Sequence, residues 1–161
     1  MAIMKHSFLT VVAIMIMIVC SSSSCDKNDD NSNTNNTPEN TTPMAKGKIK
    51  IKIGLQTFTA TLLDNNSAKA FKEMLPLTIN MVELNNNEKY YDLPSSLPTY
   101  SSNPGTIKNG DLMLYGSKTL VLFYKTFSTS YNYTKLGSVD NITDLTTALG
   151  AGNVTVTFEK D

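Results

Sequence analysis

The chain has 161 residues, with 14 lysine and arginine residues against 14 acidic residues, one histidine and two cysteines. The lysines are dispersed along the chain and there is no basic excess, so nucleic acid is not predicted as a partner. The single His6 lies near the N-terminus, and no Gly-rich phosphate loop follows a strand pattern. The composition therefore excludes a Ser-His-Asp triad, a Cys/His zinc site and a nucleotide-binding loop, and we predict neither a metal nor a cofactor.

The first 24 residues have the pattern of an export signal. Lys5 gives a charged start, residues 8–19 form an apolar run broken only by Thr10, and serines at 21–24 follow. An apolar run of about a dozen residues is too short to span a bilayer comfortably and is typical of a secretory signal peptide.

Two cysteines compete for the end of this signal. Cys20 follows Val19, a bulky residue that suits a signal peptidase poorly, whereas Cys25 follows small residues and precedes a polar, acidic run at 26–30. The arrangement around Cys25 resembles the lipobox of bacterial lipoproteins, in which the cysteine is lipidated, with Ser22 where a leucine is usual. The resemblance implies a stable membrane anchor, because the three acyl chains of such proteins exceed the two signals that stable anchoring needs.

Residues 26–30 also look like the acidic signals that send some outer-membrane lipoproteins to the cell surface. We therefore expect a lipid-anchored protein of the cell envelope, held at the outer membrane on its periplasmic or surface side. Two other interpretations remain open: a secreted protein cut within the serine run, and an uncleaved N-terminal anchor. A Cys20–Cys25 disulfide is compatible only with an uncleaved chain.

A tether is predicted over residues 25–45. The segment is nearly all Ser, Asn, Asp and Thr, with Pro38 and Pro43, and such a composition cannot bury enough apolar area to offset the entropy of ordering the backbone. Removing residues 1–24 would remove Lys5 and leave 13 lysines against 14 acidic residues, a net charge of −1. Residues 46–161 then have the length of a single domain, which we expect to be monomeric.

The domain begins with two predicted strands. Residues 46–54 alternate Lys48, Lys50 and Lys52 with isoleucines, and residues 56–63 continue the period of two. The lysine stripe is interpreted as a solvated strand face that discourages edge pairing, and the alternative is a patch for anions or a membrane.

A short helix and a third strand follow. Residues 64–67 supply side chains that can cap a helix with Ala68, Phe71 and Leu75 on one stripe, and Pro76 ends it. Residues 77–84 form a strand pattern with Ile79 and Met81 on the face of Leu77, and the three asparagines at 85–87 predict a turn.

The second half of the domain begins with residues 88–110, predicted to be irregular because they hold three prolines. A hairpin is predicted from residues 112–115 and 119–124, and Phe127, Tyr131 and Tyr133 line the loop that follows. Asp140 and Asn141 are expected to cap a short helix that buries Ile142, Leu145 and Leu149 and ends at Gly150 or Gly152. Residues 153–159 alternate as a closing strand.

The predicted fold is mainly β with two short helices. Strands outnumber helices, and the turns are rich in Gly and Asn. A closed or nearly closed β-barrel with helices over its ends is the simplest arrangement of these elements.

Several short motifs resemble one known family. Asn65-x-x-Ala68-x-x-Phe71-x-x-x-Leu75-Pro76 follows the first two strands, and the later motifs keep the same order: Glu88-Lys89, Leu93-Pro94, Gly105, Gly110-Asp111, Phe123-Tyr124 and Gly137. Together they resemble the bacterial cyclophilin-like domain over residues 46–159. Residues 136–139, before the second helix, also parallel the Phe-Gly-x-Val segment of true cyclophilins.

The resemblance implies a barrel without the isomerase machinery. True cyclophilins isomerise prolyl bonds with an arginine that hydrogen-bonds the substrate, beside a Trp and a His, whereas this sequence has no Arg, no Trp and no His after residue 6. Lysine replaces the arginine poorly, because its ammonium is a hydrated point charge rather than a planar fork. We therefore expect no catalytic residue in this domain.

An aromatic groove is the predicted ligand site. The resemblance to cyclophilins implies that Phe123-Tyr124 corresponds to the strand at the base of the substrate groove. It also implies that residues 131–133 correspond to the loop that carries the Trp. A groove with Tyr hydroxyls at its rim suits an extended peptide or a small amphipathic ligand, although alternation along strands requires about half of these side chains to be core. The predicted ligand-binding residues are Met81, Glu88, Met113, Tyr115, Phe123, Tyr124, Tyr131 and Tyr133.

Carboxylates are the other chemistry-bearing residues. Glu83, Glu88, Asp92 and Asp111 could share acid/base work or bind a hard cation, but no spacing pairs them. Asp111 is interpreted as a turn or cap residue. Glu88 is interpreted as a partner of Lys89 or of a backbone amide, with a ligand role as the alternative.

Three functions compete at this stage. The first is a membrane-tethered, non-catalytic binding module of the cell envelope. The second is a weak prolyl isomerase or folding helper, suggested by the barrel alone. The third is a structural or redox-associated accessory protein, because related domains can accompany flavodoxin-like ones.

Overall fold

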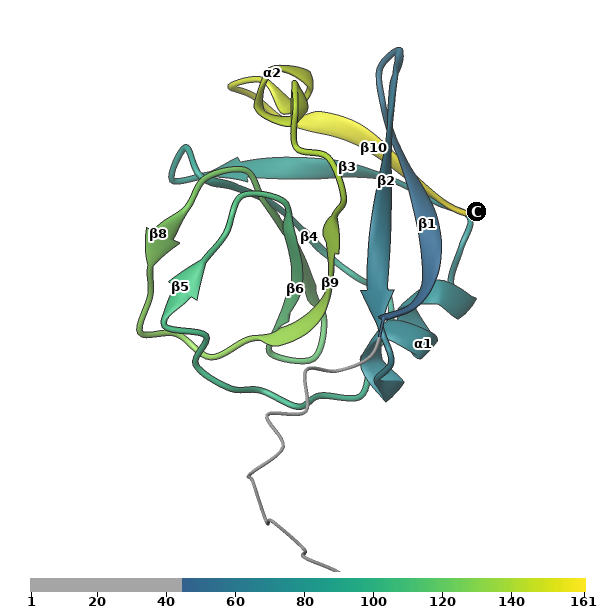
Figure 1. Ribbon diagram of the computed structural model, residues 1–161, viewed down its shortest axis with the longest axis vertical. Helices are drawn as coiled ribbons and strands as arrows, with labels where there is room; N and C mark the ends of the chain where they lie inside the picture. The colour runs from purple at the N-terminus through teal and green to yellow at the C-terminus, as the bar shows by residue number, and fades with distance from the viewer. Residues whose placement is uncertain (1–44) are drawn as a thin grey trace, which may run out of the picture. The chain divides into compact units, whose positions relative to one another are not determined.

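The computed structural model describes residues 45–161 (Figure 1). The predicted signal peptide, nearly all of the predicted tether and Cys25 lie outside the described residues. Within residues 45–161, no helix is both long and apolar enough to cross a bilayer.

A closed barrel forms the body of the domain. Among the described residues its strands follow the order β1-β10-β3-β4-β7-β6-β9-β2, and every neighbouring pair is antiparallel. The mainly β barrel predicted from the sequence is therefore confirmed. Its strands are β1 (Ala45–Ile53), β2 (Gln56–Leu63), β3 (Leu77–Leu84), β4 (Glu88–Asp92), β6 (Asp111–Tyr115), β7 (Thr119–Phe123), β9 (Thr134–Val139) and β10 (Val154–Lys160).

Period-two alternation places the apolar side chains inside the barrel. Ile49, Ile51 and Ile53 of β1 are buried, and so are alternate apolar residues of β2 and β3; Leu77 at the start of β3 is half-buried. β-Branched and aromatic side chains suit such half-buried strands, so these patterns specify the register. We call this interior the barrel core, and it also contains Met81 and Phe158.

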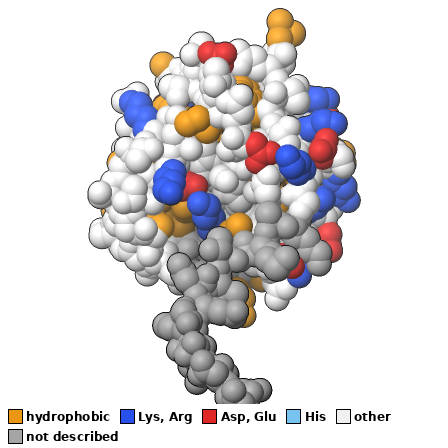
Figure 2. Space-filling model, in the orientation of Figure 1, with side chains coloured by type: hydrophobic (Ala, Val, Ile, Leu, Met, Phe, Trp, Pro, Cys, Tyr) orange, Lys and Arg blue, Asp and Glu red, His pale blue; other side chains and the backbone are white. Residues whose placement is uncertain are grey.

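The lysine stripe of β1 pairs with carboxylates. Lys48 lies 3.1 Å from Asp140, Lys50 lies 2.9 Å from Asp161, and Lys52 lies 2.8 Å from Glu159. Lysine and carboxylate side chains lie next to one another on the side of the barrel that carries β1 (Figure 2). This mixed surface supports the solvated strand face rather than a patch for anions or a membrane.

Two helices lie at opposite ends of the barrel (Figure 1). α1 (Asn66–Glu73) is capped as predicted: Asn65 Oδ1 accepts a hydrogen bond from the backbone N–H of Ala68 at 2.8 Å. Phe71 packs edge-on against Phe158 with ring centroids 5.5 Å apart.

The second helix, α2 (Leu145–Leu149), differs from the prediction at its start. Asp140 does not cap it, because that carboxylate binds Lys48 and Thr61. Ile142 is 43% exposed and is not part of the buried stripe. Gly150 ends the helix, as predicted.

Two barrel strands were not predicted. Residues 88–92 were expected to be irregular but form β4, whose one fully buried side chain is Lys89 rather than an apolar residue. Residues 134–139 form β9, where Gly137 and a register shift interrupt the alternation. A separate two-stranded sheet, β5 (Thr106–Ile107) and β8 (Phe127–Ser128), lies outside the barrel.

A second cluster of buried side chains lies on the outer face of β6 and β7. Alternate residues point inward on these strands, and Met113, Val121 and Phe123 point outward. Residues of the β5–β8 region pack over them. We call this cluster the outer core, and its buried members are Ile107, Met113, Val121, Phe123 and Tyr133.

Candidate functional site

The outer core forms part of the wall of a cavity of about 530 Å³. Outward-facing residues of β4, β6 and β7 form one part of the cavity, and residues 127–131 form another. Five aromatic rings line it, together with two carboxylates, and its lining contains no lysine. The lining residues are Leu84, Asn85, Asn87, Glu88, Tyr90, Asp92, Tyr115, Thr119, Val121, Phe127, Ser128, Thr129, Ser130, Tyr131 and Tyr133.

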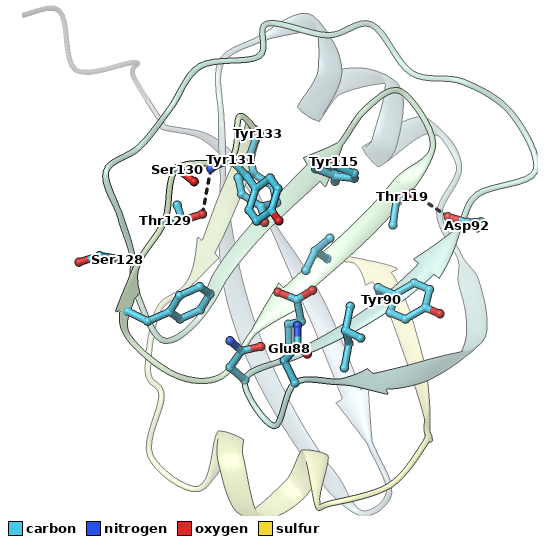
Figure 3. Close-up of a pocket in the computed structure, with 15 residues that line it drawn as sticks. Glu88, Tyr90, Asp92, Tyr115, Thr119, Ser128, Thr129, Ser130, Tyr131 and Tyr133 are labelled. Carbon is cyan, nitrogen blue, oxygen red and sulfur yellow. Dashed lines mark hydrogen bonds between the residues drawn. The ribbon is translucent and has the colours of Figure 1, made fainter.

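Three tyrosines form one side of this cavity. The ring of Tyr115 lies 6.2 Å from that of Tyr131 and 5.6 Å from that of Tyr133, measured between centroids. Figure 3 shows these rings across the cavity from Glu88 and Tyr90. Tyr131 is 62% exposed and Tyr115 is 47% exposed, so their faces and hydroxyls are accessible to a ligand.

The structure brings four of the predicted ligand-binding residues together at this cavity: Glu88, Tyr115, Tyr131 and Tyr133. Phe123 does not line it, because it is fully buried beneath the cavity and packs against Tyr133 with ring centroids 5.5 Å apart. Met113 is also buried in the outer core and lines a smaller cavity of about 290 Å³.

Two other predicted residues lie in the barrel core. Met81 has no exposed surface, and Tyr124 is 5% exposed. Both side chains are separated from the cavity because they belong to the inward face of the barrel. The structure therefore does not bring Met81 and Tyr124 to this cavity with the other predicted residues.

Glu88 is a half-buried carboxyl without a hydrogen-bond donor among the described residues. Burial and the nearby charge of Glu83 raise its pKa to about 7 from the usual 4.5. Burial and the Glu88 charge also raise the pKa of the Tyr133 hydroxyl. Perturbed carboxyl groups inside cavities are concentrated at functional sites.

Lys89 is paired with Glu83 and not with Glu88, contrary to one interpretation of the sequence. Its buried ammonium binds the Glu83 carboxylate and donates to the carbonyl oxygens of Gly150 at 2.9 Å and Gly152 at 2.6 Å. All three donors of the ammonium are thus used. Lys89 also lies 5.2 Å from the centroid of the Tyr124 ring.

Glu83 completes this buried network. The Tyr124 hydroxyl donates to the Glu83 carboxylate at 2.8 Å. Burial opposes ionisation of Glu83, but the hydrogen bonds from Lys89 and Tyr124 outweigh it and hold its pKa below the usual value. Burial and the bond to Glu83 raise the pKa of Tyr124. Because Lys89 is fully engaged here, it does not neutralise Glu88.

The other carboxylates have local partners. Asp111 is buried, accepts the backbone N–H of Lys108 at 2.9 Å and binds Lys135 at 2.6 Å, which agrees with the interpretation as a turn residue. Asp92 lines the cavity and accepts the Thr119 hydroxyl at 2.7 Å. In the part of the chain that the structure describes, no group of three or more His, Cys, Asp or Glu side chains could hold a metal ion.

Sequence reasoning missed several residues of the cavity. Tyr90 was not predicted because residues 88–92 were not recognised as a strand. In a strand, Glu88, Tyr90 and Asp92 share one face, and this period of two is the signal that would have placed Tyr90 beside Glu88. Phe127 was placed on the loop but not in the site, although its ring lies 5.7 Å from that of Phe123. The hydroxyl side chains at 128–130 carry no pattern that distinguishes them from other loop residues.

Comparison with known proteins supports the fold. The hypothetical protein AF2241 from Archaeoglobus fulgidus has a solution structure that is similar to this chain, with a TM-score of 0.56 and 14% sequence identity. The alignment covers 73% of this chain and 96% of that protein. No curated protein matches the sequence.

The model of the cyclophilin-like family matches residues 51–159. This range includes every barrel strand except the first residues of β1 and the last residue of β10. The resemblance found in the sequence is therefore confirmed, and the chain belongs to the cyclophilin-like family.

Proposed function

We propose that this protein is a non-catalytic binding module of the cell envelope, tethered to the membrane by lipid at Cys25, with a peptide or small ligand in the aromatic cavity. The observation that carries the proposal is the cavity itself. It is about 530 Å³ in volume, lined by aromatic rings and a few polar groups, and built on the outer face of a rigid barrel. Ligand sites typically have this size and this mixture of apolar walls and few polar groups.

The composition of the chain supports binding rather than isomerisation. No arginine occurs in the sequence, so no guanidinium is available to hydrogen-bond a substrate peptide as in true cyclophilins. Lys89, the lysine closest in sequence to Glu88, is fully buried and committed to Glu83 and two carbonyl groups. The residues at the cavity can therefore hold a ligand by stacking and hydrogen bonding.

Ligand binding can be tested with a library of short peptides and metabolites, followed by amide chemical shifts of the purified protein. We expect a binder to perturb residues around Tyr115 and Tyr131. The Tyr131→Ala variant should weaken that binder, because its ring is 62% exposed at the cavity. Tyr100→Ala is the matched control, since Tyr100 is 74% exposed and does not line the cavity. A library that perturbs no residue of the cavity would contradict the proposal.

Lipidation needs a separate test. Growth of the native host with a labelled fatty acid should label the wild-type protein and the Cys20→Ser variant, but not the Cys25→Ser variant. Label that persists in Cys25→Ser would refute lipidation at Cys25, and a wild-type protein without label would refute the anchor.

Weak prolyl isomerisation is the second candidate function. It is favoured by the cyclophilin-like barrel and by a cavity on its outer face. A protease-coupled proline assay would support it if turnover exceeds background and is lost in Tyr115→Ala. Phe123→Ala is a poor choice for this assay, because Phe123 is fully buried and its loss would disturb folding.

A further inference from the structure

The charges around the cavity restrict what it can bind. Its lining includes the carboxylates Glu88 and Asp92 and no lysine, and Glu83 lies close enough to Glu88 to repel it. Asp92 already accepts the Thr119 hydroxyl. Glu88 has no donor among the described residues, so an ionised Glu88 lacks a countercharge. A half-buried charge of this kind is costly unless it is paired.

A second acceptor of the cavity also lacks a partner. Asn87 lines the cavity, and its Oδ1 atom is buried without a hydrogen bond in the described structure. Unpaired buried acceptors are rare in folded proteins, and each calls for an explanation such as a missing ligand. Glu88 and Asn87 together call for N–H donors, of which at least one carries positive charge.

Aromatic rings complete the environment of a cation. Tyr115, Tyr131 and Tyr133 lie opposite Glu88 across the cavity (Figure 3). The negative faces of such rings attract a cation within about 6 Å, and tyrosine cages with an acidic residue recognise amines in this way. An apolar proline ring would gain nothing from Glu88 and would leave its charge unpaired.

We propose that the cavity binds a protonated amine, with the ammonium group between Glu88 and the rings of Tyr115, Tyr131 and Tyr133. The inference rests on the proposed function, because it names the ligand class of the same cavity. The amine is either a small free molecule or a lysine side chain of an extended peptide, and the chemistry of recognition is the same in both.

The binding should depend on pH. Glu88 interacts electrostatically with Glu83 of β3, with the Tyr124 hydroxyl beyond the end of β7 and with the Tyr133 hydroxyl before β9, and Lys89 is already engaged with Glu83. Burial raises the pKa of the Tyr124 and Tyr133 hydroxyls, so these two groups stay neutral between pH 5.5 and 8. Glu88 therefore supplies the charge that changes in this range, and amine binding strengthens as the pH rises.

The test uses matched probes that differ only in charge. n-Butylammonium is compared with 1-butanol, and the peptide acetyl-Ala-Ala-Lys-Ala-Ala-amide is compared with the same peptide acetylated on the lysine Nε. Titrations of the purified protein, followed by amide chemical shifts at pH 8, should show about tenfold tighter binding of the charged member of at least one pair. If only the peptide pair shows tighter binding of its charged member, the ligand is a lysine side chain of a peptide. If the n-butylammonium and 1-butanol pair shows the same preference for charge, a free amine is sufficient.

Two variants locate the effect. Glu88→Gln keeps the shape of the side chain and should abolish the preference for the charged probe. Glu73→Gln removes the same charge from the exposed surface of α1 and should leave the preference unchanged. An equal affinity for charged and neutral probes, or a preference that survives in Glu88→Gln, would overturn the inference while the cavity could still bind a neutral ligand. If no probe and no member of the peptide and metabolite library perturbs the cavity, the proposed function itself fails.

Discussion

Replacing Glu88 by glutamine should raise the free energy of unfolding at pH 8 and leave it nearly unchanged at pH 4. In the folded protein the pKa of Glu88 is raised to about 7, whereas the ordinary value, which applies to the unfolded chain, is 4.5. The folded state therefore holds a proton that the unfolded state has already released between these two values. Stability falls as the pH rises through this window and levels off above about pH 7.

The size of the effect follows from the same two values. Their difference corresponds to at most about 3 kcal/mol, because each step of one in pKa is about 1.4 kcal/mol. Glu88 is only half-buried, and solvent screening reduces the penalty, so we expect about 1–2 kcal/mol at pH 8. The neutral glutamine avoids this penalty, so Glu88→Gln should be the more stable protein at pH 8.

Urea unfolding followed by circular dichroism at pH 4, 6 and 8 measures this difference. The difference between wild type and variant is the useful quantity, because the other carboxylates contribute the same pH dependence to both. Glu73→Gln serves as the control and should show no comparable gain at pH 8. A Glu88→Gln protein that is less stable than wild type at pH 8, or a difference that does not change with pH, would refute the reasoning.

Other substitutions test the barrel by the same unfolding measurement. Lys89→Met should destabilise the protein by about 3 kcal/mol, because it leaves the Glu83 carboxylate and two backbone carbonyl groups without their donor; a neutral result would show that the network does not stabilise the fold. Gly137→Ala should cost about 2 kcal/mol or more, since a Cβ there would collide with the backbone oxygen of Thr61, and an unchanged urea midpoint would contradict that close approach. Asn65→Ala should cost about 1–2 kcal/mol by removing the helix cap and the bond to the Lys135 carbonyl, whereas Asn65→Asp keeps the cap and should lose less.

Strands with one apolar face could be predicted from the sequence. Residues 49–53 and 154–158 alternate without interruption, and the structure places their apolar residues inside the barrel. The strand at 88–92 could not be recognised in the same way, because its buried inward residue is Lys89. The burial of a lysine depends on Glu83, Gly150 and Gly152, which are distant partners that no local pattern reveals.

The candidate site was predicted only in part, for a related physical reason. Alternation assigns residues to two faces, but it does not say which face lies inside a barrel. Met81 and Tyr124 were assigned to the groove and lie in the barrel core. Phe123 is outward-facing, but the β5–β8 region covers it. The structure brings Tyr115, Tyr131 and Tyr133 together, and their shared cavity depends on contacts between β6 and the loop that follows β8.

Neighbouring residues of β4 show how the barrel separates stability from binding. Lys89 points inward, where its ammonium joins Glu83 and two backbone carbonyls and has no donor left. Glu88 points outward into the cavity, where the same Glu83 repels it. The positive charge closest in sequence to Glu88 therefore lies on the wrong face of the strand to neutralise it. Since alternation along a strand fixes these opposite directions, Lys89 cannot neutralise an ionised Glu88, and supplying that countercharge is the role we propose for the amine ligand.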